Sequence, residues 1–519
     1  MALLRSVATV GGYTLLSRVL GFVRDILTAA FLGAGPVADA FFIAQRLPNM
    51  FRSLFAEGAF SAAFVPLFAG RIATEGRDSA RLFAEDALAV LLAALLLFVL
   101  LGEAAMPWFI QIIAPGFAAE PGKYALTVEL TRITFPYLLF ISLVSLQGGV
   151  LNSIERFAAT AATSILLNLF LITALALSRL WPQWTAHGQA WGIAAAGFAQ
   201  FLWLMISCAR AGMALRLPWP RLTAEVRRLI RIMLPGVFGA GVTQINLLVS
   251  TAIASLLPSG AVSYLYYADR LNQLPLGVVG IAVGTAILPS LSRQIRTDEA
   301  GAARHTQNRG IELALLLTLP AAVALAVAAR PILAIFERGH FDAAAAAATA
   351  PALAAYAAGL PAFVLVKVLV PAFFARHDTA TPVKIGILAM GANIALTAGA
   401  ALLLAAPEAH IGVALATSAA GWVNALTMAA ILRRRGHLAL DARARRCLPR
   451  ILLAALGMGA VLLVAERLLA PALEGGAVLR LGALVMLVGI GLAAYGVLAL
   501  AAGAADWRDV RRRLRRQAA

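Results

Sequence analysis

The sequence has few charged residues, few cysteines and no familiar catalytic motif. Asp, Glu, Lys and Arg make up 13% of its 519 residues, whereas soluble globular chains have about 25%. Its two cysteines, Cys208 and Cys447, offer neither a disulfide framework nor the spacing of metal ligands. No H-x-x-x-H pair, phosphate-binding loop or G-x-S-x-G elbow occurs. These absences argue against a soluble enzyme, and we expect no metal and no cofactor.

Apolar sequence is what the chain has in abundance. Hydrophobic residues make up 61% of it and its mean hydropathy is +0.86. The apolar runs exceed the roughly 20 residues of a spanning helix and lack the alternation of barrel strands. We therefore predict an all-α polytopic membrane protein with fourteen transmembrane helices, at residues 5–32, 37–70, 83–113, 124–154, 158–179, 188–209, 226–256, 260–293, 308–335, 343–375, 382–405, 410–432, 448–470 and 479–503.

Six prolines inside these ranges are expected kink sites, because proline removes a helix hydrogen bond: Pro48, Pro136, Pro235, Pro275, Pro320 and Pro361. The first range contains Arg18 and Arg24 and has no A-x-A-like cleavage site, so we expect no cleavable signal peptide.

Lys and Arg are distributed unevenly between the two sets of connecting segments. When charges near a helix end are counted with the adjoining segment, the set that includes both termini carries 30 of the 43, the opposite set carries six, and seven lie deep inside the predicted helices. Positive residues concentrate on the cytoplasmic side, so both termini are predicted to be cytoplasmic. This asymmetry explains the net charge of +18 without nucleic acid. The basic segments 433–450 and 508–516 are interpreted first as topology signals, and binding to anionic membrane lipids is the alternative.

An internal repeat relates two sets of six predicted helices. The offset is 224 residues between Arg46 and Arg270, 223 between Pro66 and Pro289, and 225 between Asn168 and Asn393. Both halves begin on the same side of the membrane, so the repeat is parallel, as in transporters that bind substrate between their halves. We predict two six-helix lobes at 1–221 and 222–437, and two appended helices with a basic tail at 438–519.

Polar residues recur in helical phase in three predicted helices. They are Ser17, Arg18, Arg24 and Asp25 in the first, Asp39, Arg46, Asn49, Arg52 and Glu57 in the second, and Ser263, Asp269 and Arg270 in the eighth. A charge at the bilayer centre costs roughly 2.5–3.5 kcal/mol even on insertion scales. Arginine binds phosphate oxygens bidentately and stays charged. The excess of arginine therefore favours a water-filled site for an anion or phosphate.

The polar stripe has three alternative interpretations besides an anion site. Internal ion pairs, such as Arg24 with Asp39 or Arg270 with Asp269, would tie helices together without a ligand. A proton relay would use the carboxylates of the stripe, although cations outnumber them. An enzyme is disfavoured, because no nucleophile–base pair or metal cluster accompanies the arginines.

The same helices contain a longer motif. It consists of SRVLGFVRD at 17–25, ADAFF at 38–42, RLPN at 46–49 and FAEGAF at 55–60, with FPY at 135–137, ADRL at 268–271 and TPVK at 381–384. The pattern resembles the MurJ (MviN) family of lipid II flippases, in the multidrug/oligosaccharidyl-lipid/polysaccharide exporter superfamily, over the whole chain.

The resemblance implies a substrate and a route. Lipid II is an undecaprenyl pyrophosphate that carries the peptidoglycan disaccharide-pentapeptide, and the family moves it from the cytoplasmic to the periplasmic leaflet of the bacterial inner membrane by alternating access. Arg18, Arg24, Arg52 and Arg270 match the family's essential cavity arginines, and Asp25 and Asp39 match its acidic partners. From the polar stripe we add Ser17, Asn49 and Ser263 as substrate contacts and Glu57 and Asp269 as acidic partners.

Several points stay open after the resemblance. Some relatives have a sodium site built from carboxylates, but this chain has no Asp or Glu in 226–268 or 379–407, so we expect none. The driving force, and the roles of Arg46 and Lys367, are not determined. Cell-wall synthesis proteins are expected partners. Alternative functions are a flippase for another polyprenyl-pyrophosphate glycan and a non-transporting scaffold of the cell-wall machinery.

Overall fold

The computed structural model describes residues 2–53, 59–297, 299–405 and 408–504. Within these ranges the chain is helical almost throughout and has no β-strand. Ten of the described helices are long and apolar enough to cross a membrane. The chain is therefore a multi-pass helical membrane protein, as its composition predicts, while the count of fourteen spans stays a prediction.

The chain divides into two compact units, Met1–Ser263 with Gly339–Phe341, and Tyr264–Arg338 with Asp342–Ala519. The first contains α1 (Ala2–Leu32), α2 (Pro36–Arg52), α3 (Ala59–Glu75), α4 (Arg77–Ala104), α5 (Met106–Ile113), η2 (Pro115–Ala119), α6 (Pro121–Thr134), α7 (Tyr137–Ser153), α8 (Phe157–Leu177), η3 (Pro182–Trp184), α9 (Thr185–Arg210) and α10 (Ala224–Ser255). The second contains most of α11 (Ala261–Arg296), then α12 (Ala300–Val327), α13 (Ala329–Leu333), α14 (Ala343–Phe374), α15 (Ala380–Leu403), α16 (Ala409–Arg434), α17 (Ala442–Leu473) and α18 (Ala477–Ala501). These two units are defined by how compactly each is packed and not by the repeat. The two six-helix lobes that the repeat predicts therefore stay a prediction.

Four of the predicted ranges contain two described helices in place of one. Between α6 and α7 the break falls at Pro136, as predicted, because proline has no N–H to continue the ladder. The α4–α5 and α12–α13 breaks lie close to Pro107 and Pro331, which were not among the predicted kink sites. The other predicted prolines lie inside unbroken helices. Residues 54–58, between α2 and α3, lie outside the described part.

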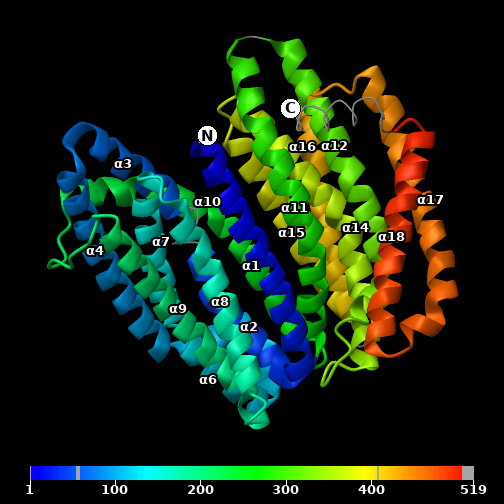
Figure 1. Ribbon diagram of the computed structural model, residues 1–519, viewed down its shortest axis with the longest axis horizontal. Coiled ribbons are helices and arrows are strands. Elements are labelled where there is room, and N and C mark those ends of the chain that lie inside the picture. Colours follow the sequence, from blue (N-terminus) through cyan, green and yellow to red (C-terminus); the bar gives the residue numbers. More distant parts are fainter. Residues whose placement is uncertain (1, 54–58, 298, 406–407, 505–519) are drawn as a thin grey trace. The chain divides into compact units, whose positions relative to one another are not determined.

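In the first unit, α9 packs on α7 and α8, and α8 packs on α1 (Figure 1). Two buried amides join α9 to α8: Gln200 Nε2 donates to the Thr163 carbonyl at 2.7 Å and Gln189 Nε2 to the Leu171 carbonyl at 2.9 Å. Lipid gives helices little hydrophobic reason to associate, so such bonds and close packing hold spans together. The two amide bonds hold α8 in place, and Arg18 and Arg24 of α1 lie against α8.

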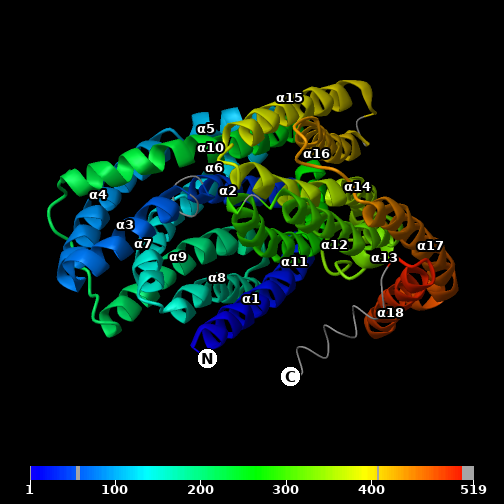
Figure 2. The same ribbon diagram turned by 90° about the horizontal axis from the view of Figure 1, so that it is seen from above.

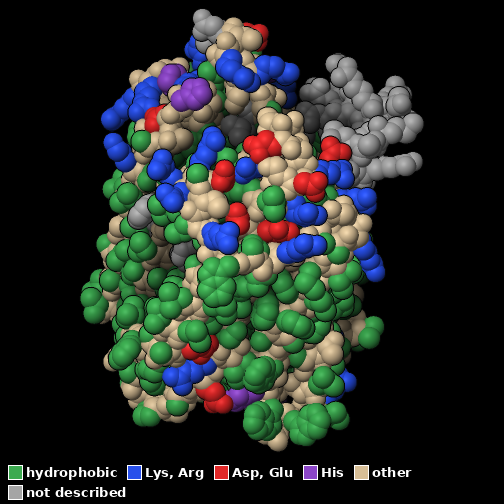
Figure 3. All heavy atoms as spheres, turned by 90° about the vertical axis from the view of Figure 1, so that its left-hand side faces the viewer, with side chains coloured by type: hydrophobic (Ala, Val, Ile, Leu, Met, Phe, Trp, Pro, Cys, Tyr) green, Lys and Arg blue, Asp and Glu red, His purple; other side chains and the backbone are tan. Residues whose placement is uncertain are grey.

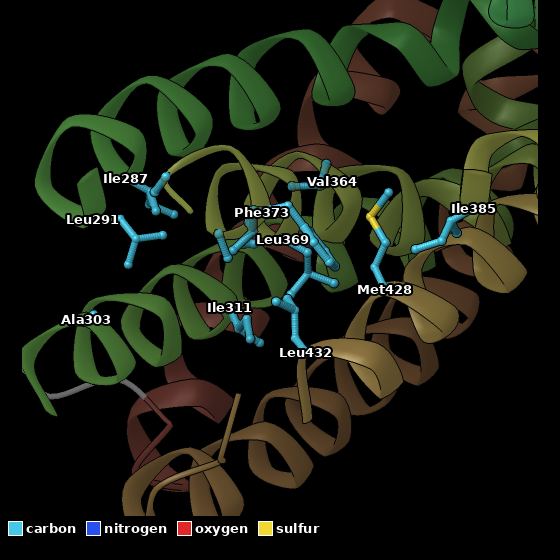
Figure 4. Close-up of a cluster of buried hydrophobic side chains, with 14 of the residues drawn as sticks. Ile287, Leu291, Ala303, Ile311, Val364, Leu369, Phe373, Ile385, Met428 and Leu432 are labelled. Carbon is cyan, nitrogen blue, oxygen red and sulfur yellow. The ribbon is translucent and has the colours of Figure 1, made fainter. Parts of the chain in front are cut away.

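In the second unit, α16 packs on α14 and α15, and α14 packs on α12. A buried apolar cluster that includes Ile287, Ile311, Phe373 and Leu432 fills the space among α11, α12, α14 and α16 (Figure 4). The order of contacts among α14, α15 and α16 repeats that among α7, α8 and α9, where the last helix touches both others. Such agreement is expected of an internal repeat.

Helices α17 and α18 lie against each other in both ribbon views (Figures 1 and 2), and α17 packs on α12. Asp441 caps α17 by accepting from the Ala444 amide at 2.7 Å, and it also accepts from Arg309 of α12 at 2.6 Å. These are the helices that the sequence predicts as an appended pair.

The outer side chains match a lipid environment. Leu97 and Leu100 of α4 are 60% and 66% exposed. On the face that Figure 3 shows, hydrophobic side chains form a broad band and Lys and Arg gather at one end. Apolar residues exposed in this way belong in a bilayer, not in water.

Candidate functional site

Arg24 of α1 is buried and is held by a hydrogen-bond network. Its Nε and Nη2 donate to Oδ1 of Asp25 at 3.1 and 2.7 Å, and its Nη1 donates to Oδ1 of Asn168 on α8 at 3.0 Å. Asn168 in turn donates to the Ser17 carbonyl at 3.0 Å and lies 3.4 Å from its hydroxyl. A buried charge requires such partners. The network fixes the guanidinium while one of its acceptors, the Asn168 oxygen, is neutral.

Arg18 lies in a different setting on the same helix. With Ser17 it lines a groove of about 440 Å³ between α1 and the adjoining ends of α7 and α8. Among the residues that the structure describes, no hydrogen bond or ion pair to Arg18 is formed. Its guanidinium is therefore available to an anion without breaking a bond.

The end of α2 carries the other predicted contacts of the first unit. Arg52 is the last residue of the helix and is half-buried. Asn49 donates its side-chain amide to the Gln45 carbonyl of its own helix at 2.9 Å. Ser53, next to Arg52, accepts from Gln244 of α10 at 3.1 Å. The Asn49 amide nitrogen is therefore engaged in a hydrogen bond within α2.

Asp39 does not pair with Arg24. Only 1% of it is exposed, and it accepts from Lys123 Nζ at 2.9 Å and from the Gly260 amide at 2.7 Å. Its other oxygen accepts from the Ser263 amide at 2.9 Å and hydroxyl at 2.5 Å. The carboxylate therefore caps the start of α11, where free amides and the helix dipole favour negative charge. The ion pair between Arg24 and Asp39, one of the alternatives for the polar stripe, is not formed.

Arg270 and Asp269 belong to the second unit. Arg270 donates through Nε and Nη2 to the Tyr266 hydroxyl at 3.1 and 3.0 Å, and its guanidinium lies 5.1 Å from the Tyr266 ring centroid. Asp269 accepts from Gln273 at 2.5 Å. Tyr266, one helical turn before Arg270, is thus a support for that arginine.

The structure brings only part of the predicted set together. Ser17, Arg18, Arg24 and Asp25 lie along the contact of α1 with α8, whereas Ser263 bonds Asp39 at the start of α11. A single cluster of four arginines stays a prediction, because Arg270 lies in the other unit. Glu57 lies outside the described residues. In the described part, no group of three His, Cys, Asp or Glu side chains is placed to bind a metal ion.

Two important residues were not predicted as part of the site. Lys123 is one of the six positive residues in the connecting segments opposite the termini, yet it is buried beside Asp39 and lies 4.1 Å from the Phe117 ring centroid. Nothing in the sequence links positions 39 and 123. In the sequence, Asn168 indicates only the internal repeat. The sequence does contain a signal for it, because a side-chain amide within an apolar helix indicates a hydrogen-bond partner.

Comparisons with known proteins agree with this architecture. Residues 28–482 match the family model described as Lipid II flippase MurJ. A probable lipid II flippase MurJ of Rhizobium meliloti (strain 1021) is 45% identical over 525 residues, covering 100% of this chain and 97% of that protein. The lipid II flippase MurJ of Burkholderia cenocepacia is 36% identical over 441 residues, covering 84% and 85%.

Solved structures show the same fold. A lipid II flippase MurJ in an inward closed conformation matches with a TM-score of 0.78 at 24% identity, covering 94% of this chain and 97% of that one. An inward-facing multidrug resistance transporter of the MATE family matches with a TM-score of 0.71 at 14% identity, covering 80% and 94%.

Proposed function

Because the chain belongs to the lipid II flippase MurJ family, we propose that it carries lipid II from the cytoplasmic to the periplasmic leaflet of the bacterial inner membrane. The observation that carries the proposal for the site is the buried Arg24 network, joined to family membership over the whole chain. The protein is then a transporter that makes and breaks no covalent bond of its substrate.

We propose that the arginines bind the pyrophosphate. Hydrogen bonds between two charged groups are about twice as strong as those with a neutral partner. A phosphate oxygen would therefore replace the neutral Asn168 oxygen on Nη1 of Arg24, which now lies 3.0 Å away, while Asp25 continues to hold the other edge. Arg18, Arg52 and Arg270 are the other proposed ligands. Moving an anion outward gains about 2.3 kcal/mol per charge at 100 mV, which favours export.

Alternating access requires non-covalent contacts that close one side of the transporter and that can be broken when that side opens. The bonds from Lys123, Gly260 and Ser263 to Asp39 lie among segments that the Lys and Arg distribution assigns to the periplasmic side. We propose that this cap keeps the periplasmic side closed while the substrate loads. Both termini are then cytoplasmic, and cell-wall synthesis proteins that use the exported substrate are the proposed partners.

The test is depletion of the protein in cells that have no second flippase. Lipid II exposed on the outer leaflet, measured with a membrane-impermeant reagent, should fall as the protein disappears, and the wild-type gene should restore it. Arg24→Ala should fail to restore it at normal protein abundance, whereas Arg77→Ala, at an exposed position at the start of α4, should restore it fully.

Different outcomes would assign different functions. Unchanged lipid II exposure after complete depletion would exclude a lipid II flippase, and a fall in another polyprenyl-pyrophosphate glycan would identify that substrate. Full restoration by Arg24→Ala would favour a scaffold that transports nothing.

A further inference from the structure

We propose that the groove beside Arg18 is a subsite for the sugar next to the pyrophosphate, with Arg18 binding a phosphate oxygen. The proposal rests on the proposed function and goes further, because it assigns sugar recognition to particular residues. The arginines alone cannot distinguish one polyprenyl-pyrophosphate glycan from another.

The lining of the groove has the composition of a sugar site. Besides Ser17 and Arg18 it contains Thr14, Asn152, Thr160 and Ser164, together with the apolar Val10, Phe157 and Ala161. Sugars present hydroxyls at their edges and C–H groups on their faces, so they need an amide and hydroxyls around an apolar or aromatic surface. The volume of about 440 Å³ is within the usual range of about 300–1,000 Å³ for small-molecule sites.

The exposure and the pairing of the side chains in the groove favour the binding of a ligand. Ser164 is exposed and Asn152 and Phe157 are half-buried, so a ligand can reach them. The described residues provide no partner for Arg18, while Arg24 is held by Asp25 and Asn168. Charged side chains within membrane segments almost always have a partner and mark the pathways of substrates or ions.

Hydrogen bonds through Asn168 connect the groove to the buried Arg24. Asn168 donates to the carbonyls of Ser17 and Ser164, at 3.0 and 3.1 Å, and accepts from Arg24. Both carbonyls belong to residues that line the groove. The groove wall and the Arg24 guanidinium are therefore positioned by one side chain.

The position of the groove fits the loading step. Asn152 and Phe157 flank the α7–α8 connection, which contains Arg156 and is on the side predicted to be cytoplasmic. Arg24 follows Arg18 by six residues, about 9 Å along a helix axis. A head group that arrives from the cytoplasmic leaflet therefore meets Arg18 and the groove first.

The experiment compares two probes, lipid II and undecaprenyl pyrophosphate, which lacks the sugars. Binding to the full-length protein in nanodiscs is measured for Asn152→Ala with Ser164→Ala, for Arg18→Ala, and for the control Ser153→Ala, whose hydroxyl bonds Gly149 of its own helix at 2.8 Å. Losing two hydrogen bonds should weaken lipid II binding about tenfold and leave undecaprenyl pyrophosphate unchanged. Arg18→Ala should weaken both probes, and the control neither.

A second measurement does not depend on truncated side chains. Ser164→Cys introduces an exposed thiol, while the native Cys208 and Cys447 are buried. Lipid II should slow its alkylation severalfold, and undecaprenyl pyrophosphate should not.

The outcomes separate this proposal from the proposed function. Equal effects on both probes by the double variant, or an unprotected thiol with lipid II bound, would overturn the sugar subsite alone. Loss of lipid II binding but not undecaprenyl pyrophosphate binding in Arg18→Ala would overturn its phosphate contact. A wild-type protein that binds neither probe would overturn the proposed function itself.

Discussion

Asp39 and Lys123 form the most completely buried ion pair described at the candidate site, with side chains 1% and 3% exposed. Burial strengthens their attraction, and additional hydrogen bonds offset the loss of water around both charges. Lys123 also donates to the Ser259 hydroxyl at 2.8 Å, and Asp39 accepts from α11. A buried pair of this kind is costly to break on one side and cheaper to remove as a whole.

Replacing one partner of this pair should therefore destabilise the protein more than replacing both. Asp39→Asn or Lys123→Met alone should cost up to about 3–5 kcal/mol, because a buried charge loses its nearest counter-charge; for Lys123, among the described residues, only the half-exposed Glu120, at 3.8 Å, would remain. The double variant should recover part of this loss. Thermal unfolding midpoints of the purified protein measure the effect, and strictly additive changes would show that the two side chains are not coupled.

At the scale of elements, the end of α1 depends on two glycines. Gly33 and Gly339 have φ angles of +68° and +58°, and the His340 amide donates to the Ala30 carbonyl at 2.9 Å. A Cβ on Gly339 would lie 2.2 Å from that carbonyl oxygen, and one on Gly33 would lie 2.5 Å from the His340 oxygen. The tip at Gly339–Phe341 can approach α1 only because neither glycine has a side chain.

Gly339→Ala should accordingly lower stability more than a change at an uncrowded glycine. Gly76→Ala is the matched control, since Gly76 has a φ of +87° but no neighbour within 4 Å of a built Cβ. Left-handed geometry alone costs about 1–2 kcal/mol, and the clash adds to this at Gly339. If both variants unfold at the same temperature, the close contact at Ala30 is not important for stability.

The connection between α14 and α15 provides a pH-dependent contact outside the membrane helices. Asp378 accepts from Arg435 at 2.6 Å and from the Thr381 hydroxyl and amide at 2.7 and 2.9 Å. These hydrogen bonds, that from Arg435 above all, lower the pKa of Asp378 from 3.8 to about 2. The stabilisation is therefore complete above the unfolded-state pKa and is lost as the pH falls through about 2.

Asp378→Asn removes this charge, so wild type should unfold at a higher temperature than the variant at neutral pH. The difference should stay constant down to about pH 4 and then shrink toward pH 2, where the wild-type carboxylate becomes protonated. Unfolding midpoints across this range test it. A difference that vanishes between pH 7 and 5 would contradict the assigned pKa.

At the scale of the whole molecule, the Lys and Arg distribution predicts which ends of the helices face the cytoplasm. Arg77 and Gln183 are both exposed, at the start of α4 and in η3, and the sequence assigns them to opposite sides of the membrane. Since the native cysteines are buried, single cysteines at these positions can be labelled selectively.

In intact cells, a membrane-impermeant maleimide should label Gln183→Cys and should leave Arg77→Cys unlabelled until the membrane is opened. The physical reason is the retention of positive segments on the cytoplasmic side. The opposite pattern would invert the predicted topology and with it the direction of transport. Each variant serves as the control for the other, because both are measured under the same conditions.

The sequence by itself determined the class of molecule and the family, and it predicted that arginines inside the membrane helices bind the substrate. Long apolar runs can only be helices in lipid, and charges within them are too costly to occur without a role. The pairing of those charges was decided by tertiary structure. Arg24 bonds Asn168, 144 positions away, and Asp39 bonds Lys123, 84 positions away. Hydrogen bonds act over about 3 Å, and only packing sets which side chains come that close. For this reason Arg18 is available to a ligand while Arg24, on the same helix, is already held.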